Sequence, residues 1–148
     1  MAILRRVGEI LSIRGDRVGK ARRIAAAIRD SGEYGWVGIY DVTPDEIAVV
    51  AWSGPSPPAI PTFPINQGLC GASVASRATV VVGDVARDPR YLTTLGTTRS
   101  EIVVPVLDRE GGGVVGLLDV ASDLPDAFSA EDRSRLEECA AALAPFWT

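Results

Sequence analysis

The spacing of apolar residues changes twice along the chain, and these changes constrain the fold more than any other feature of the sequence. Up to about residue 30 the apolar residues are three or four positions apart, whereas from residue 34 to residue 122 they alternate or form short runs. The helical spacing returns after residue 129. Spacings of three and four are typical of a helix with one buried face, and alternation is typical of a strand. The sequence therefore predicts helices at both ends and strands between them.

Two helices are predicted within about residues 1–30, and a third within about residues 129–146. The apolar stripes of the first two helices are Ile3, Leu4, Val7, Ile10 and Leu11, and then Val18, Ala21, Ile24, Ala25 and Ile28. The third helix carries Leu136, Cys139, Ala140 and Leu143 at helical spacing. Ser129 is its candidate N-cap, because Asp132 follows three residues later and serine is a favoured capping residue.

The central region predicts antiparallel strands. A turn, TPDE, separates the alternating residues 34–42 (YGWVGIYDV) from residues 47–52, and the glycine-rich REGGG separates residues 100–108 from residues 113–122. Such short polar turns between apolar runs are typical of hairpins. Residues 68–77 (GLCGASVASR) predict a short helix.

Two further segments complete the predicted architecture. Residues 53–64 hold five of the ten prolines and predict a stiff loop without regular hydrogen bonding, and residues 78–85 predict a buried strand. We therefore expect one domain over residues 1–148, of the α+β class. In it a central antiparallel sheet carries the terminal helices on one face and ligand-pocket loops on the other.

Composition excludes several functions. The net charge of −4 argues against a nucleic-acid partner, and no apolar run approaches the roughly 20 residues that span a bilayer, so no membrane association is expected. The N-terminus lacks the apolar centre of a signal peptide, and we expect a cytoplasmic protein with free thiols. The absence of histidine excludes Ser-His-Asp and Cys-His catalysis. We expect no metal site and no cofactor.

Four segments in series resemble the GAF domain, a fold that senses small molecules and cofactors. They are YGWVGIYDV, GLCGASVASRATVVVGDVARDPRY, RSEIVVPVLD and GGVVGLLDVASD, and the similarity extends from about residue 21 to residue 146. Within that fold the chain is most similar to the free methionine-(R)-sulfoxide reductase branch. The resemblance implies a pocket of aromatic and acidic side chains that holds methionine sulfoxide while cysteines reduce it.

Much of that binding set has a counterpart here. The resemblance places the pocket aromatics at Trp36 and Tyr40, the acid of the SEI motif at Glu101 and the acid of the following strand at Asp119. A second acid of that last strand corresponds to Ala121, so one anionic group is missing.

The cysteine set is less complete. The cysteine that the resemblance implies as the attacking group corresponds to Thr94, whose hydroxyl is too weakly acidic for this chemistry, and the neighbouring Leu95 cannot replace it. A further family cysteine corresponds to Ile60. Only Cys70, in GLCG, is retained, and Cys139 matches no family cysteine. The catalytic cysteine is therefore missing from the pattern.

Each candidate also has a structural interpretation. At the start of a helix, Cys70 has a lowered pKa if the helix dipole acts on it, which favours a reactive thiolate; a small apolar filler is the alternative that we favour. Trp36 and Tyr40, with Tyr34 on the same strand face, either line a pocket or form aromatic core. The sequence does not decide between pocket lining and aromatic core for these aromatic residues.

The charged candidates divide in the same way. Glu101 and Asp119 are both expected at strand ends, where either could accept hydrogen bonds from a ligand ammonium. The alternative for Glu101 is a solvated charge at the sheet edge. The alternative for Asp119 is an acid that is hydrogen-bonded to loop amides. Asp84 is interpreted as a carboxylate that closes a turn onto backbone N–H groups. The arginines of the first two helices are interpreted as a solvated face; they are Arg5, Arg6, Arg14, Arg17, Arg22 and Arg23.

These observations favour a stand-alone, sensor-like GAF domain that binds a small molecule bearing an amine or thioether, rather than an enzyme. The alternative is a methionine-(R)-sulfoxide reductase with rearranged cysteines, in which Cys70 is catalytic and an external thiol is the reductant. A scaffold with a vestigial pocket is the third possibility. We expect a homodimer through the helices, with the first helix packed on the terminal helix or on its own copy.

Overall fold

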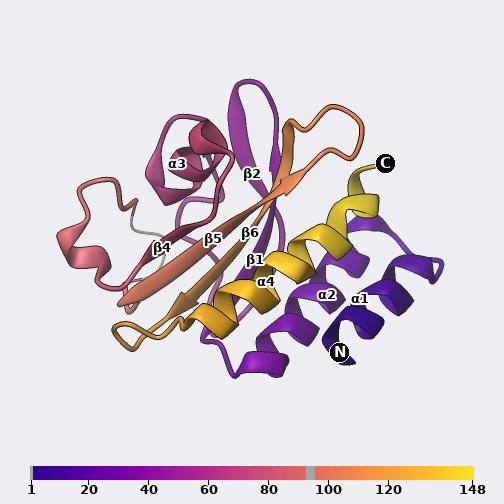
Figure 1. The fold of residues 1–148 in the computed structure, drawn as a ribbon, viewed down its shortest axis with the longest axis horizontal. Helices are drawn as coiled ribbons and strands as arrows, with labels where there is room; N and C mark the ends of the chain where they lie inside the picture. The colour runs from indigo at the N-terminus through magenta and orange to yellow at the C-terminus, as the bar shows by residue number, and fades with distance from the viewer. Residues whose placement is uncertain (1, 93–95) are drawn as a thin grey trace.

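The computed structural model describes residues 2–92 and 96–148, and within them the chain forms one antiparallel sheet of six strands in the order β3-β2-β1-β6-β5-β4 (Figure 1). The strands are β1 (Trp36–Val42), β2 (Glu46–Ser53), β3 (Thr62–Pro64), β4 (Val80–Val82), β5 (Ser100–Leu107) and β6 (Val114–Ser122). The helices are α1 (Ala2–Ser12), α2 (Arg17–Gly32), α3 (Gly68–Ser76) and α4 (Ala130–Leu143), with short 3-10 turns at Val85–Arg87 and Ala144–Trp147.

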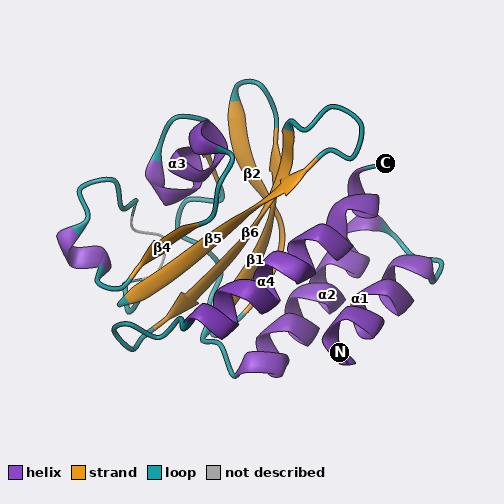
Figure 2. Cartoon of the chain, in the orientation of Figure 1, coloured by secondary structure: helices purple, strands orange, loops and turns teal. Residues whose placement is uncertain are grey.

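The helices form two unequal layers on the sheet. Figure 2 shows α1, α2 and α4 together on one face, with α3 and the long connections on the other. This arrangement confirms the predicted α+β class. It also divides the buried residues into a helix-side core, which includes Ile28, Val104 and Leu136, and a pocket-side core, which includes Tyr40, Leu69 and Val103. No helix in the described ranges has the length and apolar character that crossing a membrane requires.

Local sequence signals begin and orient the helices. The side chain of Asp16 caps α2 by accepting from the Gly19 N–H at 2.9 Å, and Ser129 and Asp132 form a reciprocal capping box at α4. The predicted stripe of α2 is buried except for Val18, which is 44% exposed because neighbouring elements do not cover the first turn. Helix α1 packs on α2 and α4, the first of the two arrangements expected for it.

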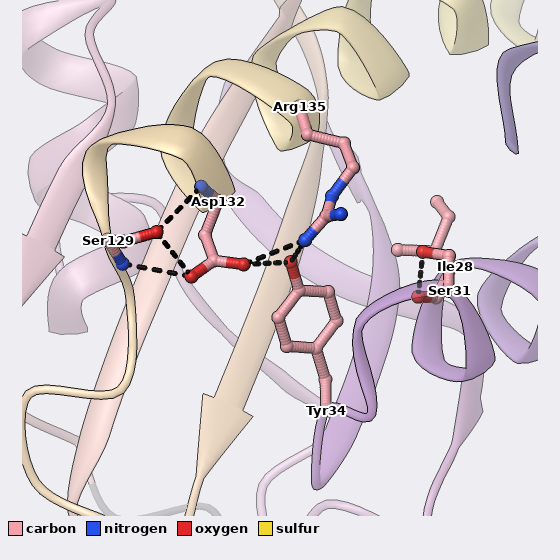
Figure 3. Close-up of polar contacts among 6 residues, drawn as sticks. All are labelled: Ile28, Ser31, Tyr34, Ser129, Asp132 and Arg135. Atoms are coloured by element: carbon pink, nitrogen blue, oxygen red, sulfur yellow. Dashed lines mark hydrogen bonds and ion pairs between the residues drawn. The ribbon is translucent and has the colours of Figure 1, made fainter. Parts of the chain in front are cut away.

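Tyr34 does not share a face with Trp36 and Tyr40, and that prediction was wrong. Strand β1 begins at Trp36, so the alternation does not extend back to Tyr34, whose ring lies in the helix-side core. Its hydroxyl donates to Oδ1 of Asp132 at 2.8 Å and accepts from Arg135 at 3.1 Å (Figure 3). These bonds connect the end of α2 to the first turns of α4.

The two edge strands also differ from the prediction. Residues 78–85 yield only a three-residue edge strand, and Val81 is 41% exposed because β4 has a neighbour on one side alone. The proline-rich residues 53–64 contain β3, which pairs with β2 at the other edge. Proline is tolerated there because an edge strand needs ladder hydrogen bonds on one side only.

Candidate functional site

A small enclosed cavity lies on the pocket side of the sheet, between the strands and α3. Its polar lining consists of Tyr40, Cys70, Glu101 and Asp119, and its apolar walls include Phe63, Leu69, Tyr91 and Leu92. The cavity volume is about 10 Å³, which is the space needed for roughly one water molecule. The structure thus brings together four of the five residues predicted for the site.

Strand register places these side chains on one face. Asp119 lies opposite Val103 on β5 and opposite Gly38 on β1, while Glu101 lies opposite Ala121. Glu101 and Asp119 are therefore diagonal neighbours on adjacent strands, at a separation that long side chains bridge. Both are almost fully buried, at 5% and 3% exposure. This placement excludes the interpretation of Glu101 as a solvated edge charge.

The two carboxyl groups differ in protonation. Burial raises the pKa of both groups, and that of Glu101 lies well above its usual range because the Asp119 charge and a hydrogen bond to Asp119 add to the burial. Hydrogen bonds from Glu101 and Cys70 act in the opposite direction on Asp119. The proton is therefore held preferentially by Glu101, and Asp119 is the acid of the pair that ionises first.

Cys70 is a protonated thiol in this setting. Its Sγ donates to Oδ2 of Asp119 across 3.7 Å. Burial and the neighbouring Asp119 and Glu101 raise the pKa of Cys70 well above its usual range. The prediction that the helix dipole lowers this pKa was wrong, because a nine-residue helix supplies about half a positive charge, whereas the sulfur is buried beside two carboxyl groups.

Apart from the interaction between Glu101 and Asp119, two polar atoms of the cavity have no hydrogen-bond partner among the described residues: the hydroxyl of Tyr40 and Oδ1 of Asp119. Tyr40 is completely buried, and an unsatisfied buried polar group costs about 1 to 3 kcal/mol. Burial and the nearby acids also raise the pKa of Tyr40 well above its usual range, so its hydroxyl is a donor at neutral pH. The cavity therefore offers one donor and one acceptor to a bound molecule.

Trp36 lies beside this cavity without lining it. Its ring is 6.5 Å from that of Tyr40, and its Nε1 donates to the carbonyl of Ser56 at 3.1 Å. The indole instead lines an adjacent surface hollow of about 330 Å³, together with Pro55 and Ala121. A Cβ added at Gly38 would lie 2.4 Å from the indole, so the strand has a glycine where this ring packs.

The structure adds residues that sequence reasoning missed. Phe63 packs its ring edge-on against Tyr40 at 6.1 Å, and Leu69 precedes the cysteine on α3. Nothing in the local sequence separated Phe63 from the proline-rich loop around it. Thr94 and Leu95, the predicted counterparts of the attacking cysteine and its neighbour, lie outside the described residues.

The two cysteines cannot act as a pair. Both are free and buried, but Cys70 belongs to the pocket-side core and Cys139 to the helix-side core, so the sheet separates them. Ile60 packs at the margin of the pocket-side core. Within the ranges that the structure describes, no group of three or more histidine, cysteine or acidic residues is placed to hold a metal ion.

Comparison with known proteins identifies relatives of this chain. The family model of the GAF domain matches residues 20–146. The free methionine-R-sulfoxide reductase of Neisseria meningitidis, solved with its substrate, is 31% identical, with a TM-score of 0.87 over 98% of this chain and 86% of that one.

Two further relatives support the same relationship. The type II free methionine-R-sulfoxide reductase of Thermoplasma acidophilum is 34% identical, with a TM-score of 0.77 over 88% of this chain and 94% of that one. GAF domain-containing protein A of Dictyostelium discoideum is 27% identical over 137 residues, which are 92% of this chain and 84% of the relative.

Proposed function

Because this chain belongs to the GAF domain family, we propose that it acts as a stand-alone, sensor-like domain that binds a small molecule in the cavity around Asp119. The observation that carries the proposal is the pair of unpartnered polar atoms, the Tyr40 hydroxyl and Asp119 Oδ1. A ligand that accepts from the first and donates to the second removes both penalties when it binds.

The charge of the cavity selects the chemistry of the ligand. Asp119 is the acid of the buried pair that ionises first, and its carboxylate favours an ammonium group as the donor to Oδ1. Phe63 and Leu69 provide apolar walls for a short side chain. An amino acid with an apolar or thioether side chain combines these features. The cavity of about 10 Å³ must expand to admit one, so binding requires movement of its walls.

Two features favour binding over catalysis. Burial, together with the neighbouring Asp119 and Glu101, keeps Cys70 in the thiol form, whereas the thiolate is the nucleophilic form. In addition, Cys139 lies across the sheet and cannot form a disulfide with Cys70. Any oxidised form of Cys70 would need a thiol from another molecule.

The alternative function is reduction of free methionine-(R)-sulfoxide by Cys70 with an external thiol. It is favoured by the similarity to the Neisseria meningitidis reductase, which extends over 98% of this chain. In this alternative Cys70 gives its proton to the sulfoxide oxygen and its sulfur attacks the sulfoxide sulfur. The oxygen passes to Cys70 as a sulfenic acid while the thioether, methionine, leaves. Two equivalents of the external thiol then reduce the sulfenic acid to the thiol, releasing water and their own disulfide. The two functions differ in whether methionine, the thioether product, is formed from the bound sulfoxide.

One experiment separates these functions. The protein is titrated with L-methionine-(R)-sulfoxide by calorimetry and is then incubated with it and dithiothreitol, with methionine measured by chromatography. We expect saturable binding without turnover, and a gain in the free energy of unfolding of about 2 to 3 kcal/mol at roughly 100 times the Kd. The N-acetylated sulfoxide, which lacks the ammonium group, should bind at least about tenfold more weakly.

Matched variants make the result specific. Asp119→Asn should abolish binding, whereas Asp30→Asn, at an exposed position on α2, should leave it unchanged. Turnover that Cys70→Ser abolishes would overturn the binding proposal in favour of the reductase. Absence of both binding and turnover with methionine, its sulfoxide and other apolar amino acids would overturn the binding proposal and the reductase alternative. The remaining possibility would be a scaffold with a vestigial pocket.

A further inference from the structure

We propose that the chain has a second binding site, for a small organic anion with an apolar body, in a groove between α4, β5 and the connection from α3 to β4. The groove exists because the two strands differ in length. Strand β4 pairs with β5 only from Val103 to Glu101, but β5 continues to Leu107. Beyond Val103 the sheet has an open edge, and a cavity of about 410 Å³ lies there.

The floor and one wall of this groove are apolar. Val104, Pro105 and Leu107 contribute the floor, and Leu107 is 42% exposed. Ala141 of α4 and Ala144, in the 3-10 turn that follows α4, extend the apolar surface. A volume of this size is within the usual range of small-molecule sites. The groove therefore provides burial for the hydrocarbon part of a ligand.

The rim of the groove is positively charged. Arg77, Arg109 and Arg133 line it with a single acid, Glu137, so its formal charge is +2 (three minus one), although the whole chain carries −4. The Glu137 carboxylate already accepts a hydrogen bond from Thr79 Oγ1 at 2.5 Å and forms an ion pair with Arg133 Nε at 3.4 Å. The groove thus has an excess of donors for an anion.

Two of these arginines are available to a ligand. Across residues 2–92 and 96–148, no ion pair or side-chain hydrogen bond involves Arg77 or Arg109. This distinguishes them from Arg17, for example, which is paired with Asp41. Guanidinium groups bind carboxylates through two parallel hydrogen bonds. Arg77 follows the last residue of α3 and Arg109 lies in the turn after β5, so two elements present cations above one apolar floor.

The chemistry of the open edge favours a small molecule over a peptide strand. A peptide that extended the sheet would need N–H donors along residues 104–107 of β5. Pro105 has none, and proline at a strand edge is a common obstacle to strand addition. An anion with a short hydrocarbon chain needs no backbone donor, since it would use the guanidinium groups and the apolar floor.

The probe for this site is octanoate, and its binding is followed by amide chemical shifts of the full chain. We expect saturable shifts at Thr79 and Ala141, and none at Cys70 in the enclosed cavity. Acetate has the carboxylate without the hydrocarbon, and octylammonium has the hydrocarbon with the opposite charge. Each should bind at least about tenfold more weakly than octanoate, since each lacks one of the two interactions.

Paired variants test the residues. Arg77→Asn together with Arg109→Gln should weaken octanoate at least about tenfold, because each change removes a charged hydrogen-bond donor; asparagine suits the left-handed backbone of Arg77 (φ 55°). The control is Arg5→Gln with Arg14→Gln, both exposed and outside the groove. Leu107→Glu should abolish binding, whereas Leu124→Glu, at another exposed leucine, should not.

The contrary results are equally specific. No saturable octanoate binding, shifts centred on Cys70, or equal affinity for octylammonium would overturn the site. Equal weakening by the control arginine pair would show a general charge effect and would overturn it as well. The enclosed cavity has no part in these outcomes, so failure here leaves the amino-acid proposal intact.

Discussion

The thiol of Cys70, in the first turn of α3, donates its hydrogen bond to Oδ2 of Asp119 in β6, across 3.7 Å. Asp119 also interacts with the carboxyl group of Glu101, and apart from that group Oδ1 has no partner among the described residues. Cys70 therefore orients the carboxylate to which we assign ligand binding in the proposed function.

Two tyrosines provide a matched test of buried hydroxyl groups. Tyr34→Phe should lower the free energy of unfolding by about 1 kcal/mol, because the bonds to Asp132 and Arg135 are lost. Tyr40→Phe should leave it unchanged or higher, because that hydroxyl has no partner in the described structure. Urea unfolding of both variants measures the difference. A larger loss for Tyr40→Phe would contradict this account of the cavity.

Stability should fall with rising pH because of Glu101. Its pKa in the folded state lies well above its ordinary value of 4.5, so the folded state binds a proton that the unfolded state has already released. The contribution is fully present below pH 4.5 and is lost as the pH rises through the folded-state pKa. Urea midpoints between pH 5 and pH 8 measure it.

Glu101→Gln supplies the control for this pH effect, because glutamine keeps the shape of the side chain and does not titrate. We expect the variant to show a flatter dependence of stability on pH between 5 and 8. The same slope in both proteins would assign the effect to another group.

Both thiols should react slowly in the native protein. The pKa of Cys139 is raised from 9.0 to about 11, mainly by burial; each pKa unit is a factor of ten, so its thiolate fraction at pH 8 falls about 100-fold. The pKa of Cys70 is also raised, mainly by burial. Labelling with a thiol reagent, with and without urea, measures the rates. A fast thiol that disappears in Cys70→Ser would contradict the protonated state assigned to Cys70.

A pair of glycines tests the packing around Trp36. Gly38→Ala places a methyl group 2.4 Å from the indole and 3.0 Å from the ring of Tyr40. Overpacking of this kind costs about 1 to 3 kcal/mol. Gly8→Ala, in α1 with no atom within 4 Å of the new Cβ, should instead stabilise by about 0.5 to 1 kcal/mol. Thermal unfolding of the two variants should therefore shift in opposite directions.

Much of this architecture could be predicted from local sequence patterns. The apolar period sets which face of each helix is buried, and Ser129 with Asp132 specifies where α4 begins. The alternation in β5 and β6 places Glu101 and Asp119 on the same side of the sheet. These signals are reliable because helix and strand geometry repeat along the chain and require no knowledge of distant residues.

Only the tertiary structure decided the chemistry of the site. The protonation state of Cys70 depends on its burial and on Glu101 and Asp119, which are 31 and 49 positions away in sequence. Together these raise the pKa of the thiol by more than the end of α3 lowers it. Tyr34 is turned to the helix side by Asp132 and Arg135 of α4. The arginine-rimmed groove depends on where β4 stops pairing with β5. The sequence thus determined the fold and, within the strands, which residues share a face, whereas the side taken by Tyr34, the charge states and the cavities depended on contacts between distant segments.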